Sequence, residues 1–248
     1  MSDDSQWPMG RVMQLIHDEP HPIHTPDGVV GDLTKLCLVL VRELPAADAG
    51  VSLIGDSGEA GRLAAAGPTG WVLEDLQFSL GEGPCLAAHS SRRPLLIADL
   101  DSVDGHRWPA YTPAARSHGL RAVFAFPLQI GAARLGALDI YRDVPGPLSE
   151  SALRTGFVFA EVAVRLLLAA QHGAPNGAAA AGVHEALAYR MQVYQAQGMV
   201  MVDLGVTLAE AMARLRGHAF ASGRSVTDVA LDIIAGKIVI EKDEEVDE

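Results

Sequence analysis

The strongest constraint on the fold of this chain is a pair of helix-start signals in its last third, a T-x-x-E motif at Thr207 and an S-x-x-D motif at Ser225. In such a motif the hydroxyl oxygen accepts a hydrogen bond from a backbone amide of the first helical turn, and the acid completes a capping box. Gly205 and Gly223 precede the two motifs and suit the ends of the preceding helices. Apolar residues recur at helical spacing on both sides, so residues 183–237 are predicted to form three consecutive helices.

This three-helix region is not basic. Residues 183–240 carry five Lys/Arg against five acids, and residues 241–248 add six acids against one lysine. A nucleic-acid binder that works by bulk attraction should be basic, because counterion release from phosphates supplies much of its affinity. Nucleic-acid recognition here must therefore rest on a local cluster that reads exposed loop bases by stacking and hydrogen bonds. The alternative is that Arg214 and Arg216 form a solvated helix face and that the tyrosines pack.

Residues spread over this region match a known pattern in order and spacing: Ala186, Leu187, Arg190, Gln195–Met201, Ala209–Ala211, Leu215, Arg216, Ala219, Val229, Ala230, Ile233 and Ile234. In these residues the region resembles the ANTAR domain, a three-helix RNA-binding module of bacterial transcription antiterminators. The resemblance implies binding to paired RNA stem-loops in nascent transcripts, which prevents a terminator hairpin from forming. Gln197 departs from the pattern, because many members have lysine before the glycine. The candidate RNA contacts are Arg190, Tyr194, Ala196, Gln197, Gly198 and Arg216.

The first 170 residues alternate strand-like and helix-like segments. Helices are expected over residues 27–44, 71–78, 84–91 and 110–118, and strands over residues 49–54, 61–66, 95–97, 121–130 and 133–141. The last two strands form a hairpin across Gly131. Mixed elements that end in an antiparallel pair predict an α+β domain built on an antiparallel sheet.

Several short motifs in this part also match a known family: Gly81–Cys85, Leu96–Leu100, Arg107–Pro109, Gly119–Val123, Phe126–Leu128 and Leu135–Tyr141. Residues 25–171 resemble a GAF sensor domain of the kind found in actinobacterial regulators. The resemblance implies a ligand pocket between the sheet and its covering helices, lined by Phe78, Leu86, Asp99, Trp108, Tyr111, Phe126 and Asp139. The cofactor or ligand stays unknown, because GAF domains bind cyclic nucleotides, tetrapyrroles, haem, small acids, or nothing identifiable. The alternative is a closed core without a ligand.

Cys85 and His89 are four residues apart on one helix face, a spacing that suits two ligands of a metal or haem. Two ligands do not close a site, and a lone cysteine usually behaves as a small hydrophobe, so no metal is predicted. Cys37, the second cysteine, lies on an apolar helix face. A redox enzyme of the GAF fold, such as a free-methionine-sulfoxide reductase that uses cysteine pairs, would therefore lack a resolving partner for Cys85.

Residues 149–171 are expected to form a helix at the end of the sensor domain. Its apolar residues alternate spacings of four and three, which is typical of a coiled-coil seam. The seam residues are Leu153, Phe157, Ala160, Val164 and Leu167. This pattern predicts a homodimer, and the alternative is that the helix packs on its own sheet.

The domain boundaries follow from these segments. We expect a flexible N-terminal arm over residues 1–24, the GAF sensor over 25–171, a linker over 172–182, the ANTAR domain over 183–240 and an acidic tail over 241–248. No apolar run reaches the ~18 residues that a membrane span needs, and no signal peptide is evident, which predicts a cytoplasmic protein. The function expected is that of a signal-responsive antitermination regulator and not an enzyme. A protein-interaction scaffold without RNA binding is the alternative.

Overall fold

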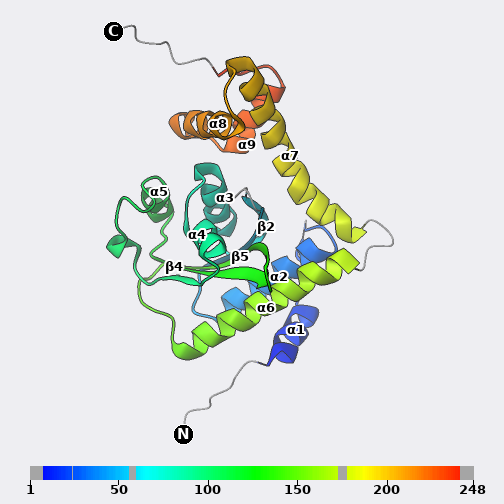
Figure 1. Ribbon diagram of the computed structural model, residues 1–248. Coiled ribbons are helices and arrows are strands. Elements are labelled where there is room, and N and C mark those ends of the chain that lie inside the picture. The colour runs from blue at the N-terminus through cyan, green and yellow to red at the C-terminus, as the bar shows by residue number, and fades with distance from the viewer. Residues whose placement is uncertain (1–7, 24, 56–59, 173–177, 241–248) are drawn as a thin grey trace. The chain divides into compact units, whose positions relative to one another are not determined.

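The computed structural model describes residues 8–23, 25–55, 60–172 and 178–240, with side chains described throughout except at residues 60, 171, 172 and 178–190. The acidic tail expected over residues 241–248 lies outside the described residues. The chain divides into two compact units, Met1–Ala186 and Leu187–Glu248. Figure 1 shows the elements of both units along the chain.

The first unit is built on a five-stranded antiparallel sheet with the strand order β2-β1-β5-β4-β3. Its strands are β1 Asp48–Ile54, β2 Ala60–Ala66, β3 Leu95–Ile97, β4 Ala122–Ile130 and β5 Ala133–Arg142. Gly131, with a φ of 55°, makes the tight turn of the β4–β5 hairpin. The α+β class and the antiparallel sheet predicted from the sequence are confirmed.

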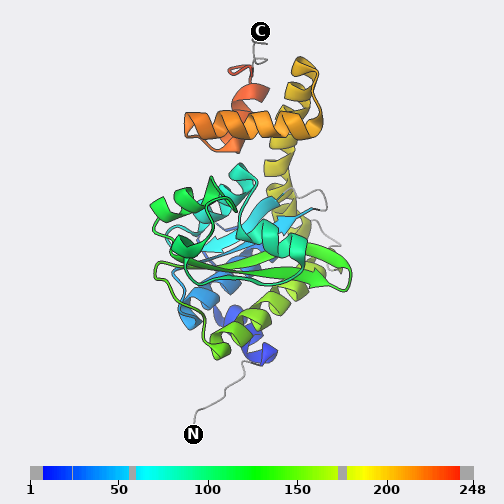
Figure 2. The same cartoon turned by 60° about the vertical axis from the view of Figure 1, so that its left-hand side comes forward.

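Helices cover both faces of this sheet, as Figure 2 shows. One face carries α2 Val29–Glu43 and α6 Glu150–His172, and α1 Met9–Asp18 packs against these two helices. The other carries α3 Gly70–Leu80, α4 Pro84–Ser91 and α5 Tyr111–Ser117, with the 3-10 turn η1 Leu100–Ser102. Because successive side chains of a strand point to opposite faces, β5 sends Leu138 and Ile140 into the first core and Tyr141 into the second.

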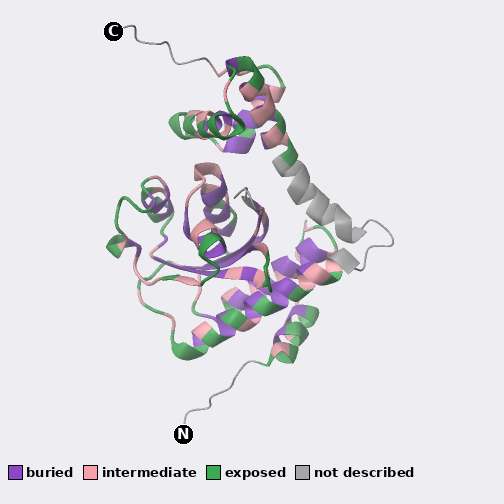
Figure 3. Ribbon diagram, in the orientation of Figure 1, coloured by how far each residue is buried: buried purple, intermediate pink, exposed green. Residues whose placement is uncertain are grey.

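The face under α2 and α6 holds the larger apolar core. Leu33, Leu36 and Leu40 of α2 are fully buried there, together with Phe124 of β4 and Phe159 of α6. Figure 3 shows the buried residues concentrated on the sheet and on the helix faces turned toward it.

The N-terminal segment differs from the expected flexible arm. Residues 9–18 form α1, whose Val12 and Ile16 are buried in the core formed with α2 and α6. These two residues lie one helical turn apart, so a short amphipathic helix can bury both. The expected linker is also shorter, because α7 already begins at Ala178 and residues 173–177 lie outside the described residues.

The second unit consists of helices α7 Ala178–Leu204, α8 Leu208–Ser222 and α9 Val226–Ile234, and the unit boundary falls within α7. The predicted caps are present: the Thr207 hydroxyl accepts a hydrogen bond from the Glu210 amide at 3.2 Å, and the Ser225 hydroxyl accepts one from the Asp228 amide at 3.1 Å. Small and branched apolar residues fill the core between the three helices: Val193, Ala196, Val200, Leu204, Ala211, Leu215, Ala219, Val226, Val229, Ala230 and Ile233.

Candidate functional site

The first unit buries two carboxyl groups between α3 and the sheet. Asp139 and Tyr141 come from β5, on the face opposite Leu138 and Ile140, and Glu74 comes from α3. Glu74 and Asp139 are each only 1% exposed. We call Ser52, Glu74, Gln77, Asp139 and Tyr141 the acidic cluster.

Hydrogen bonds join all five members of the acidic cluster. The Tyr141 hydroxyl lies 2.6 Å from Glu74 Oε1 and 3.1 Å from Asp139 Oδ2. The Gln77 side-chain amide donates to Asp139 Oδ2 at 2.7 Å and to the Tyr141 oxygen at 2.9 Å, while Ser52 donates to Glu74 Oε2. A phenol has one proton and cannot donate to two carboxylates, so one of the two carboxyl groups must itself hold a proton and donate it to Tyr141.

The electrostatics agree with this proton count. Burial raises the pKa of Glu74 to about 7, against the opposing hydrogen bonds from Ser52 and Tyr141. Burial and the nearby charge of Glu74 raise the pKa of Asp139 well above its usual range. Both shifts follow from the cost of placing charge in a poorly hydrated interior.

Two glycines, Gly50 and Gly83, leave the space that the side chains of Glu74 and Gln77 occupy. A Cβ at Gly50 would lie 2.1 Å from Glu74 Oε1, and a Cβ at Gly83 would lie 2.6 Å from Gln77 Oε1. Gly83 also has a φ of 140°, which side-chain-bearing residues rarely adopt. The Gln77 carbonyl oxygen accepts the Cys85 amide at 2.8 Å, so the start of α4 is tied to α3.

Tyr111 adds a further buried hydroxyl on this side of the sheet. Its side chain is fully buried, its Oη has no hydrogen-bond partner among the described residues, and the same holds for Asp139 Oδ1. Burial and then the charge of Asp139 raise the pKa of Tyr111, which places its hydroxyl within electrostatic range of the acidic cluster. The Glu82 carboxylate accepts the backbone amides of Ala110 and Tyr111 at 2.7 and 2.8 Å, so it anchors the start of α5 to the α3–α4 loop.

The structure brings together only some of the residues expected to line a ligand pocket. Trp108 and Tyr111 contact each other edge to face, with ring centroids 6.1 Å apart, in the core that also contains Tyr141. Phe78 is buried on α3 and Leu86 is half-buried on α4. Asp99 caps η1, where its carboxylate accepts the Asp101 amide at 2.9 Å.

Phe126 lies on the other face of the sheet from Asp139, so its expected place in one pocket with Asp139 is wrong. Its ring packs against Gly156 and meets Phe157 of α6 edge to face at 5.3 Å. The alternation of β4 requires this, since Phe124 and Leu128 enter the same core. Sequence reasoning missed Ser52, Glu74, Gln77 and Tyr141. The signal available for Tyr141 was its place two residues after Asp139, on the same face of a mostly apolar strand.

The two cysteines lie in different environments and both are buried. Cys37 belongs to the core under α2, whereas Cys85 lies at the start of α4 on the opposite face of the sheet. Burial raises the pKa of both thiols. Within the described part of the chain no three His, Cys, Asp or Glu side chains are grouped so as to hold a metal.

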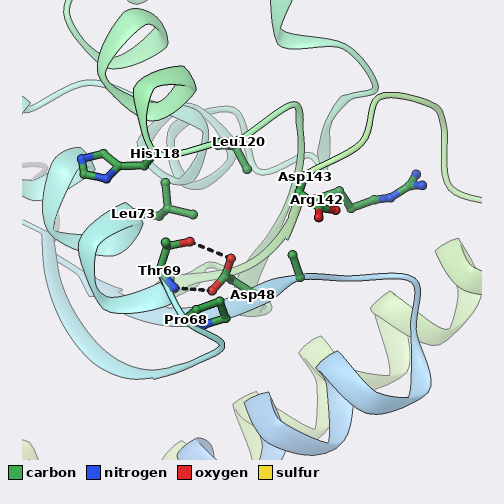
Figure 4. Close-up of a pocket in the computed structure, with 10 residues that line it drawn as sticks. Asp48, Pro68, Thr69, Leu73, His118, Leu120, Arg142 and Asp143 are labelled. Carbon is green, nitrogen blue, oxygen red and sulfur yellow. Dashed lines mark hydrogen bonds between the residues drawn. The ribbon is translucent and has the colours of Figure 1, made fainter.

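A small surface pocket of about 150 Å³ lies where β1 begins and β5 ends. Figure 4 shows the Asp48 carboxylate accepting hydrogen bonds from the Thr69 amide and hydroxyl, at 2.7 and 2.8 Å, at the N-terminus of α3. His118 and Arg142 lie to either side and point away from this pair. Asp48 therefore anchors Thr69, the N-cap residue of α3, and its carboxylate is engaged within the domain.

Three of the expected RNA contacts, Tyr194, Gln197 and Arg216, lie where α7 meets α8. Gln197 donates from its side-chain amide to the Leu208 carbonyl oxygen at 2.7 Å. Arg216 is half-buried on α8; burial lowers its pKa, and Tyr194 of α7 is near enough to oppose that shift. Gly198 has open space at the position of a Cβ.

Two other expected contacts do not join this group. Ala196 is fully buried in the helical core, so its place in an RNA contact is wrong and its role is packing. The side chain of Arg190 lies outside the described residues.

Several cations of the second unit are engaged by acids. Arg214 lies 3.5 Å from Glu210, and Asp232 accepts both Arg224 at 2.6 Å and Lys237 at 3.1 Å. Phe220, by contrast, is 64% exposed on α8. The second unit therefore presents an exposed aromatic ring on α8, while the positive charges of Arg214, Arg224 and Lys237 are paired with acids.

The expected dimer seam on α6 is mostly used within the first unit. Ala160, Val164 and Leu167 are buried in its core and Leu153 packs against it, because this stripe faces the sheet and α2. Phe157 stays 48% exposed beside an open groove of about 670 Å³ that also contacts Ile130 of β4.

Comparisons with known proteins agree with this architecture. A family described as GAF domain matches residues 30–167, and one described as ANTAR domain matches residues 181–234. No curated protein matches the chain. No helix among the described residues is long and apolar enough to cross a membrane.

Two solved GAF domains share the fold of the first unit. The GAF domain of an Acinetobacter phosphoenolpyruvate-protein phosphotransferase is 12% identical, with a TM-score of 0.51, over 69% of this chain and 98% of that one. The GAF domain of the corresponding protein from Coxiella burnetii is 19% identical, with a TM-score of 0.50, over 70% and 99%. At these identities the likeness concerns the fold alone.

Proposed function

Because the chain belongs to the GAF domain family and carries a C-terminal ANTAR domain, we propose that it is a signal-responsive RNA-binding regulator that acts by transcription antitermination. The GAF domain senses a small molecule in the cytoplasm. The ANTAR domain binds paired stem-loops in a nascent transcript and keeps a terminator hairpin from forming. This architecture is that of a regulator rather than an enzyme.

The observation that carries RNA binding is the grouping of Tyr194, Gln197 and Arg216 within the ANTAR segment. Arg216 is held by packing, so its guanidinium loses little conformational freedom when it contacts a base. Its Nε is itself buried and has no partner among the described residues, so the contact with RNA falls to the rest of the half-buried guanidinium. Since Arg224 and Lys237 are engaged by Asp232, recognition rests on base contacts more than on phosphate attraction.

Two stem-loops call for two ANTAR modules, which a homodimer provides. The groove beside Phe157 is the surface of the GAF domain that we assign to the second copy. Glu161 and Arg165 flank the groove as an ion pair of 3.2 Å, and an antiparallel copy of α6 would meet them with opposite charges. A signal changes RNA binding only if the ligand has different affinities for two arrangements of this dimer.

A protein-interaction scaffold is the second candidate. It is favoured by the exposed apolar residues of the second unit, above all Phe220, Met191 and Val202, which a protein partner could cover. An electrophoretic mobility shift with a paired stem-loop RNA separates the two candidates, since a scaffold would leave the RNA unshifted.

The same assay tests the RNA contact with matched variants. Arg216→Ala should weaken binding tenfold or more, about 1.4 kcal/mol, because it removes a base contact. Arg214→Ala is the control, since Arg214 points to another side of α8 and pairs with Glu210. Equal affinity of wild type and Arg216→Ala, with unchanged circular dichroism, would remove Arg216 from the interface.

A further inference from the structure

The acidic cluster holds more hydrogen-bond acceptors than its neighbours satisfy. Asp139 Oδ1 and Tyr111 Oη are both buried and both lack a partner among the described residues. They come from β5 and α5, two elements that face the same core. A buried polar atom left without a partner is costly, so a pair of them beside two carboxyl groups calls for a specific occupant.

The positive charge that acts on Glu74 is already paired with another acid. Arg62 of β2 lowers the pKa of Glu74, but its guanidinium forms an ion pair with Asp75 at 3.2 Å. The Gln77 amide donates both its described hydrogen bonds within the cluster. A donor for Asp139 Oδ1 therefore has to come from outside this set of side chains.

We propose that the acidic cluster, together with Tyr111, is a binding site for a small organic cation that donates N–H hydrogen bonds, such as a protonated amine or guanidine group. Asp139 Oδ1 accepts from the cation, Tyr111 Oη accepts a second N–H, and Glu74 supplies the balancing charge. The proposal rests on the sensory role proposed for the GAF domain and gives the chemical class of its signal.

The chemistry of the site disfavours anions and hard divalent metal ions. Two carboxyl groups repel an anion. Calcium prefers six to eight oxygen ligands and magnesium a regular octahedron, whereas the oxygens of Ser52, Tyr141 and Gln77 are already engaged within the cluster. A cation with directional N–H donors needs only the acceptors that the cluster leaves open.

Binding of this cation is coupled to proton release. Without the cation one carboxyl group of the cluster is protonated, because Tyr141 has a single proton and can donate it to only one of the two carboxyl groups. When the cation enters, that proton leaves for solvent, so the cation replaces the proton and the net charge of the site does not change. Affinity for the cation should therefore rise with pH across the range in which Glu74 titrates, around its pKa of about 7.

The site also has a built-in reporter and a path for the signal. The rings of Trp108 and Tyr111 pack edge to face with their centroids 6.1 Å apart, so a ligand that engages Tyr111 changes the surroundings of the indole. Glu82 ties the backbone of Tyr111 to the loop between α3 and α4. Occupation of the site thus acts on three helices together.

The test uses the full chain with Trp108 as the only tryptophan and follows its fluorescence. Guanidinium and methylammonium at millimolar concentration are the probes, and urea and methanol are their uncharged counterparts. We expect a saturable change with the two cations alone, and an apparent affinity that increases severalfold from pH 6 to pH 8. An equal response to charged and uncharged probes would overturn the proposal, as would no response.

Two variants locate the site. Tyr111→Phe removes one hydroxyl and should weaken cation binding about tenfold without loss of fold, and Asp139→Asn should abolish it. Asp143→Asn, an exposed acid after the end of the same strand, is the control and should bind as wild type does. Unchanged binding in Tyr111→Phe together with Asp139→Asn would contradict the assignment.

Failure of this inference is separable from failure of the proposed function. The RNA mobility shift needs none of these probes, so RNA binding without cation binding would reject the ligand class and leave the regulator standing. Cation binding without an RNA shift would reject RNA recognition and retain the site.

Discussion

Replacing Glu74 by glutamine should make the first unit more stable at neutral and alkaline pH. The glutamine carbonyl can still accept the bond from Ser52, and its NH2 group can donate to the Tyr141 oxygen as a protonated carboxyl would. Glutamine has no proton to lose, so position 74 stays uncharged at every pH.

The magnitude follows from the pKa of Glu74, which burial raises from 4.5 to about 7. Between these values the unfolded chain has released the proton and the folded chain still holds it, so the free energy of unfolding falls as the pH rises. The contribution of Glu74 is fully present below pH 4.5 and is lost through pH 7, a difference of about 3 kcal/mol. Asp139 no longer feels the charge of Glu74 in the variant, so its pKa is less strongly raised there than in wild type.

Urea unfolding at pH 4.5 and pH 8 measures this difference, with tryptophan fluorescence as the signal. All three tryptophans precede residue 109, so the signal reports on the first unit. The advantage of Glu74→Gln over wild type should grow by roughly 3 kcal/mol from the lower to the higher pH. Glu161→Gln, at an exposed position of α6, is the control and should follow wild type. Parallel pH profiles of Glu74→Gln and wild type would show that Glu74 is ionised in the folded protein and refute the proton count.

Three further results are expected. Phe157→Glu should turn the dimer into a monomer by light scattering, because it places a charge in the exposed groove; an unchanged mass with intact circular dichroism would move the interface elsewhere. Thr207→Ala should lower the stability of the second unit by about 1 kcal/mol in urea unfolding followed by circular dichroism, since it removes the cap of α8; no change would mean that the cap is replaced. Cys37 and Cys85 should both resist alkylation by iodoacetamide until the protein is unfolded, because burial keeps their thiols protonated, and rapid modification of either in the native protein would contradict their environments.

The sequence predicted the order and type of the elements because their signals are local. Glycines, capping residues and periodicity lie within a few residues of each helix or strand end, and the caps at Thr207 and Ser225 form as expected. The sequence analysis missed α1, since its two buried residues are too few to stand out beside the prolines and histidines around them, and it missed the three-residue turn η1.

The site was less predictable because it depends on contacts across the sheet. Glu74 and Asp139 are 65 positions apart, and only the pairing of β1 with β5 and the packing of α3 bring them together. Phe126 was placed on the wrong face of the sheet. The face that a strand residue occupies depends on whether its position in the strand is odd or even, and the family motif does not give that information. The stripe on α6 was ambiguous for a similar reason: burial against a sheet and burial against a second copy require the same apolar spacing.

The alternation along β5 has a consequence for how such a protein can diverge. The side chains of Leu138 and Ile140 lie in a tightly packed core, where most substitutions reduce stability. Asp139 and Tyr141, at alternate positions of the same strand, face a buried polar network on the other side of the sheet, so substitutions there do not alter the side chains of that core. A lineage can therefore acquire a new signal by substitutions at alternate positions of one strand while it inherits the fold unchanged.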